Sequence, residues 1–111
     1  MPLFITQGRF TLDAVRGMLA KPEDRAGTVG KLFAQSGGKL LAYYMTFGEY
    51  DFMVISEGPI EGVAATSIAA AASGGVDHVK TTLAMSSADM KTAFANAGAA
   101  AKSFRSAGAS S

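Results

Sequence analysis

Cysteine is absent from this 111-residue sequence, and histidine occurs only once. The lack of cysteine excludes disulfides, thiolate metal sites and cysteine nucleophiles, and nothing points to an oxidising compartment. One histidine without any cysteine also argues against a structural zinc site, which needs four such ligands. No metal site is therefore expected, and the sequence requires no cofactor.

Strong charge and long apolar runs are missing as well. The formal net charge is +1, and the ten Lys and Arg residues are scattered, so a nucleic-acid partner is not expected. The apolar stretch Ala64–Ala72 is far shorter than the roughly 20 residues of a membrane span. The first ten residues lack the basic segment and the apolar core of a signal peptide. We therefore expect a cytoplasmic protein with no membrane partner.

The composition that remains is that of one small globular domain, with 49% apolar and 17% charged residues. Its clearest structural signal is a β-hairpin, formed by the apolar runs Leu40–Phe47 and Phe52–Ser56. The connecting turn is Gly48-Glu49-Tyr50-Asp51. Gly48 is expected there for an unusual backbone angle or a close approach of two backbones.

Capping residues, prolines and glycines predict the other elements. They are, in chain order, a strand at Leu3–Thr6, a helix after Thr11, a helix from Pro22 to Gly37, a helix from Pro59 to Ser73, a strand at Val76–Met85 and a helix capped by Ser86. The helix after Pro59 is rich in alanine, and its expected buried face is Ile60, Val63, Ala64, Ile68, Ala71 and Ala72.

This order predicts an α+β domain of the ferredoxin-like βαββαβ type over residues 1–94. An Ala/Gly/Ser-rich C-terminal helix and tail follow over residues 95–111, and the end of the tail is expected to be disordered. Neither face of the hairpin strands is clearly polar, since Met53 and Ile55 alternate with Phe52 and Val54. Because the helices cover only one face, a second subunit is expected to cover the other.

The hairpin turn also carries a family resemblance. Gly48-Glu49-Tyr50-Asp51 resembles the Gly-x-Tyr-Asp signature of the small bacterial GYD-domain proteins, at the same place between two strands. Pro22–Arg25, Gly37–Leu40, Gly58-Pro59 and Val79–Leu83 resemble that family in order and spacing. The resemblance implies a dimeric α+β barrel, in which two sheets face each other. The family has no established activity, so the resemblance supplies no catalytic residues.

Two groups of residues are candidates for function. In the turn, Tyr50 and Asp51 either fix the hairpin or line the mouth of a ligand pocket. Elsewhere, His78 is either a surface residue of the last strand or, if its side of that strand faced a barrel interior, a general base or a haem ligand. Strand alternation puts Asp77 on the face opposite to His78, and it puts Tyr43 and Tyr44 on opposite faces of their strand.

Two classes of function remain open. The first is a homo-oligomeric module that binds a small apolar ligand or serves assembly. The alternative is a cofactor-independent monooxygenase or isomerase, or a haem-binding enzyme, that acts in the cavity between two sheets. In the enzyme, His78 and Tyr43 or Tyr44 would move a proton.

Overall fold

The computed structural model describes residues 1–108 of the chain. Its elements are β1 (Leu3–Phe10), α1 (Leu12–Ala20), α2 (Ala26–Gln35), β2 (Lys39–Met45), β3 (Phe52–Glu57), α3 (Ile60–Ala72), β4 (Val76–Ala84) and α4 (Ser87–Ala101). The end of the tail, for which disorder is expected, lies outside the described residues. No helix of the described part is long and apolar enough to cross a membrane.

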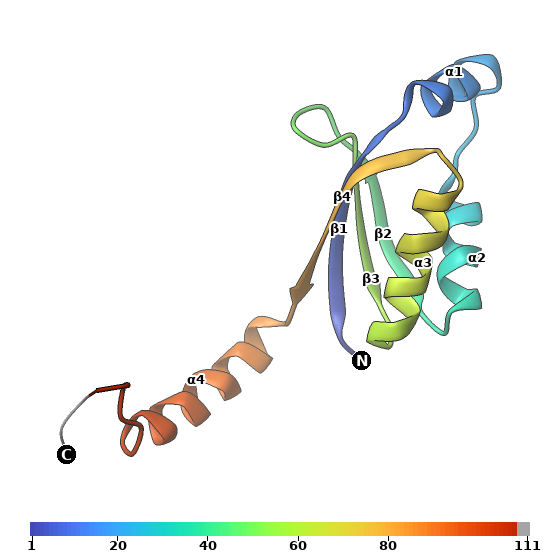
Figure 1. Ribbon diagram of the computed structural model, residues 1–111. Coiled ribbons are helices and arrows are strands. Elements are labelled where there is room, and N and C mark those ends of the chain that lie inside the picture. Colours follow the sequence, from blue (N-terminus) through green and yellow to red (C-terminus); the bar gives the residue numbers. More distant parts are fainter. Residues whose placement is uncertain (109–111) are drawn as a thin grey trace.

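The four strands form one antiparallel sheet in the order β2-β3-β1-β4. Figure 1 shows α2 and α3 side by side on one face of this sheet. This is the predicted ferredoxin-like α+β arrangement, in which the two central strands come from the beginning and the middle of the chain.

Two strand ends differ from the prediction by more than one residue. β1 continues beyond Thr6 to Phe10, because Gln7 and Gly8 remain in register with β3. β2 stops at Met45, and Phe47 lies in the turn with its side chain fully exposed. Gln7-Gly8 is therefore not a strand terminator, since pairing to β3 holds the extended backbone in spite of the glycine.

The predicted helix start at Pro22 is wrong. α2 begins at Ala26, and the Asp24 carboxylate accepts a hydrogen bond from the Ala26 N–H at 2.9 Å. Asp24 thus satisfies one of the unpaired donors of the first turn. The caps predicted for α1 and α4 are confirmed, with the side chains of Thr11 and Ser86 accepting from the N–H of Ala14 and Asp89.

The predicted buried face of α3 is also wrong, apart from Val63. The helix buries Val63 and Thr66, whereas Ile60 and Ile68 are more than half exposed. α3 is apolar nearly all round, so periodicity alone leaves its orientation open. A close approach determines it instead: a Cβ on Gly62 would overlap the carbonyl oxygen of Ser36.

The apolar core of the described residues is small. Its buried members, on the helix-covered side of the sheet, are Phe4, Phe33, Phe52, Val54 and Val63. Phe10 and Phe52 stack at a tilt, with ring centroids 5.2 Å apart. So few fully buried apolar residues provide limited stability for one isolated domain of this size.

α4 stands away from the rest of the molecule, as Figure 1 shows at the end of β4. None of its residues is buried, and Phe94 is 72% exposed. The extended arm accounts for the elongated dimensions of 66 × 27 × 23 Å.

Candidate functional site

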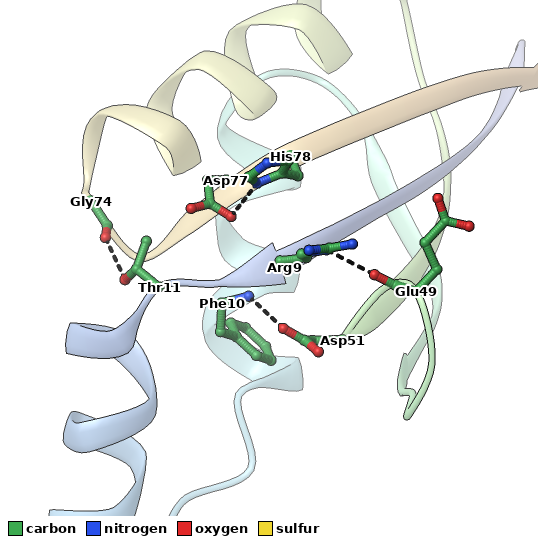
Figure 2. A network of polar contacts seen from close by, with 8 residues as sticks. All are labelled: Arg9, Phe10, Thr11, Glu49, Asp51, Gly74, Asp77 and His78. Carbon is green, nitrogen blue, oxygen red and sulfur yellow. Dashed lines mark hydrogen bonds and ion pairs between the residues drawn. The ribbon is translucent and has the colours of Figure 1, made fainter.

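The signature turn is tied to the end of β1 by hydrogen bonds (Figure 2). The Asp51 Oδ2 accepts from the backbone N–H of Phe10 at 3.0 Å, and the Asp51 N–H donates to the carbonyl of Gly8 at 2.8 Å. The Arg9 Nε donates to the carbonyl of Glu49 at 2.8 Å. These contacts make the turn a brace between the hairpin and β1.

Tyr50 and Gly48, the other two residues of the turn, make no side-chain hydrogen bond to β1 in the described structure. Tyr50 is half-buried and provides its backbone carbonyl, which accepts from the Thr46 hydroxyl at 2.7 Å. Gly48 does not have the role expected for it, because its φ is not positive and a Cβ there would meet nothing within 4 Å. The close approach occurs at Gly8, where a Cβ would lie 2.6 Å from the Phe52 ring.

His78 lies beside Asp77, not on the opposite face. Its Nδ1 is 2.9 Å from the Asp77 Oδ1, and both side chains are more than half exposed. The expectation of opposite faces is wrong because His78 adopts a φ of +51°, at an irregularity where the register between β1 and β4 shifts. The extra residue of such a bulge disrupts strand alternation and re-aims the side chain.

The same bulge separates Val76 from Lys80, two residues that strand alternation would put on one face together with His78. Val76 packs against the core on the helix-covered side, whereas Lys80 pairs with Gln7 on the other side. Sequence spacing puts Val76 and Lys80 on one face, so the bulge changes which residues share a surface.

Tyr43 and Tyr44 do lie on opposite faces of β2. Tyr43 packs against the core cluster of Phe33, Phe52 and Val54, and Tyr44 is 59% exposed on the uncovered side. β2 and β4 are the two edge strands of the sheet, so both tyrosines are three strand spacings from His78. At about 4.8 Å per spacing this is about 14 Å, too far for a shared proton transfer within one protomer.

No group of three or more His, Asp or Glu side chains in residues 1–108 is placed to hold a metal ion. His78 also lines neither of two cavities that lie on the helix-covered side of the sheet. Its side chain is 67% exposed in the protomer.

The sheet face opposite α2 and α3 carries a cluster of apolar side chains, which we call the open face. In Figure 1 no helix of the described chain covers it. Its residues follow from the strand registers, in which Ile5 pairs with Ile55, Ile55 with Ala42, and Met53 with Tyr44. The apolar members are Leu3, Ile5, Ala42, Tyr44, Met53 and Ile55.

The helix-covered side holds two adjoining cavities that the sequence pattern does not indicate. An apolar chamber of about 80 Å³ lies between the sheet, α2 and α3. A groove of about 570 Å³ lies between α1, the segment of residues 21–25 and the end of α3. Residues that line both are Phe10, Leu32, Tyr43, Ala70 and Val76.

Tyr43 stands where the chamber and the groove meet. Burial raises the pKa of its phenol above the ordinary value, while the nearby Arg25 charge lowers it and Asp24 raises it. Burial outweighs the Arg25 charge, because removing a phenolate from water disfavours its charged form. Tyr43 therefore remains a neutral hydrogen-bond donor at physiological pH.

The architecture defines a ferredoxin-like α+β protein with one face of its sheet uncovered. The model of the GYD domain family matches residues 4–94, and the chain belongs to this family. No curated protein sequence matches the chain.

Two solved structures are similar at low sequence identity. One is described as the crystal structure of FFRP-DM1, with 15% identity, a TM-score of 0.48, and coverage of 77% of this chain and 100% of that chain. The other is TTHA0845 from Thermus thermophilus, with 18% identity, a TM-score of 0.49, and coverage of 78% of this chain and 95% of that chain.

Proposed function

We propose that the protein is a homo-oligomeric binding module, in which two copies join through the open faces of their sheets. The pair would form the dimeric α+β barrel and would hold a small apolar ligand or serve assembly. The observation that carries this proposal is the apolar composition of the open face, with Ile5 and Ile55 paired at its middle. We further propose that the protein acts in the cytoplasm.

Physical considerations support a second copy as the cover. Exposed contiguous apolar surface on a soluble protein marks an interaction site. A two-fold interface suits a sheet face, because the same patch serves both partners. The small core of one protomer gives a further reason, since association would bury the apolar surface that the fold leaves exposed.

α4 supports assembly independently of the sheet. A helix of 15 residues without tertiary contacts is marginal in water, and none of the residues of α4 is buried. Met90 and Phe94 are four residues apart, so both side chains project from the same side of α4. Contact with a second copy would bury this pair and stabilise the helix.

The enzyme alternative has less support in the geometry. His78 and the tyrosines of β2 lie at opposite edges of the sheet, so an acid and a base do not converge in one protomer. Asp51 is engaged with the Phe10 backbone. A binding module needs no such convergence, and the binding function is therefore preferred.

Light scattering combined with size-exclusion chromatography tests the proposal. The chain has a mass of 11.4 kDa, and we expect twice this value for the native protein. Ile55→Lys should reduce the mass to that of one chain, because it puts a charge in the middle of the open face. Ile68→Lys is the matched control, since Ile68 is 69% exposed on α3, and it should leave the mass unchanged. A native mass of 11.4 kDa at every concentration would contradict the proposal.

A further inference from the structure

The groove on the helix-covered side has the dimensions of a ligand site. Its volume of about 570 Å³ falls within the range of about 300–1,000 Å³ that is usual for small-molecule pockets. The adjoining chamber extends it inward between the sheet and the two covering helices. The groove and the chamber together therefore offer an apolar interior with an opening to solvent.

The position of α1 keeps the groove open. The helix is attached at its start, where the Thr11 N–H donates to the Gly75 carbonyl. The Thr11 hydroxyl donates to the Gly74 carbonyl, as Figure 2 shows. Beyond this attachment no residue of α1 is buried. Ala14 and Gly17 face the groove, and their small size leaves the space that larger side chains would fill.

Some of the charged side chains at the mouth of the groove have a hydrogen-bond or ion-pair partner, and one has none in the described residues. Glu23 and Arg25 form an ion pair at 3.0 Å, and the Asp24 carboxylate accepts from the first N–H of α2. Lys21 lines the groove and forms no ion pair within residues 1–108. Lys21 is thus a positive charge without an ion-pair partner in the described residues, beside an apolar interior.

We propose that this groove binds a small amphipathic carboxylate. The apolar part of the ligand would lie along Met18 and Ala70 toward the chamber, and its carboxylate would pair with Lys21. The Tyr43 phenol, at the junction of the groove and the chamber, would donate a hydrogen bond to a polar atom of the ligand. This inference rests on the ligand-binding part of the proposed function and names the ligand class, but it places the site in each protomer, away from the open face.

Titration of the full ¹⁵N-labelled chain with decanoate, below its micelle concentration, tests this inference by NMR. We expect the largest amide shifts around the groove, at Gly17 and Gly75, and small shifts at Ile5 and Ile55 on the open face. Decanol has the same alkyl chain without the charge, and it should bind about fivefold more weakly, the upper range for an exposed ion pair.

Two variants separate the role of Lys21 from general electrostatic attraction. Lys21→Gln should weaken decanoate binding about fivefold and leave decanol binding unchanged. Lys31→Gln, an exposed residue of α2 that lines neither cavity, should have no effect on either ligand. Shifts confined to the open face, equal effects of the two variants, or no decanoate binding at all would overturn the inference. The light-scattering mass is measured separately, so failure of this site is distinguishable from failure of the dimer.

Discussion

The Asp51 carboxylate accepts a hydrogen bond from the backbone N–H of Phe10 at 3.0 Å, across a separation of 41 residues. This contact joins the turn between β2 and β3 to the last residue of β1. The aspartate of the family signature thereby fixes the turn to the end of β1. Arg9 binds the same turn through the carbonyl of Glu49. The signature aspartate therefore has a structural role in the fold.

Substitution of Asp51 should lower the free energy of unfolding. Asp51→Ala leaves the half-buried Phe10 N–H without its acceptor, at a cost of about 1–3 kcal/mol. Asp51→Asn keeps an acceptor oxygen and should cost less, because only the charge is lost. Urea denaturation followed by circular dichroism measures both.

Glu49→Ala is the control for Asp51, since Glu49 contributes its backbone carbonyl and an exposed side chain. We expect a change within about 0.5 kcal/mol for this variant. Equal losses for Asp51→Ala and Glu49→Ala would show that the carboxylate contact does not stabilise the fold.

Gly62 should be intolerant of any side chain. A Cβ at this position would overlap the Ser36 carbonyl oxygen, so α3 would have to move away from the end of α2. We expect Gly62→Ala to destabilise the protein by about 1–3 kcal/mol, in spite of the higher helix propensity of alanine. A Cβ on Gly27 in α2 would have no atom within 4 Å, so Gly27→Ala should be neutral or stabilising. Thermal melts monitored by circular dichroism compare the two variants. Similar melting temperatures for the two variants would contradict the close approach.

Local patterns in the sequence were sufficient for most of the fold. The hairpin, the order of elements and the alternation of Phe52 and Val54 with Met53 and Ile55 depend on neighbours in the chain, and the structure confirms them. The face of α3 depends on a contact between Gly62 and Ser36 instead. An alanine-rich helix carries too little periodicity to reveal such a contact.

The candidate site was less accessible to sequence reasoning. A bulge in β4 brings His78 next to Asp77, and a second irregularity in β2 brings Leu40 and Tyr43 to the same core side. A bulge follows from pairing with a distant strand, so alternation along one strand fails beyond it. The groove near Lys21 was missed for a similar reason, because it exists only through the placement of α1 relative to α3.

Replacement of Ser56 by alanine should not lower the free energy of unfolding. Its side chain is fully buried between the sheet and the helices, and its hydroxyl has no hydrogen-bond partner in the described chain. An unpaired buried hydroxyl costs about 1–3 kcal/mol, so Ser56→Ala should leave the stability equal or higher.

Thr66→Val provides the comparison for Ser56. The buried Thr66 hydroxyl donates to the Gly62 carbonyl at 3.0 Å, so its removal should lower stability by about 0.5–1.5 kcal/mol. Urea denaturation of both variants gives the comparison. A loss for Ser56→Ala as large as that for Thr66→Val would mean that Ser56 has a partner, such as a bound water.

The Tyr43 phenol should lose its proton at a higher pH than an ordinary tyrosine does. Burial raises the pKa of its phenol, while the unfolded chain titrates near the ordinary value of about 10. Below that value the phenol is neutral in both states, and the free energy of unfolding does not depend on this group. Between the ordinary pKa and the raised pKa the unfolded chain binds fewer protons, so stability falls with rising pH.

Absorbance of the phenolate at high pH measures this titration directly. Tyr43→Phe should remove the late-titrating component and flatten the loss of stability above about pH 10. Tyr44→Phe should leave the late component in place, because Tyr44 is 59% exposed on the open face. Absence of a late component that Tyr43→Phe removes would show that burial does not raise the pKa of this phenol.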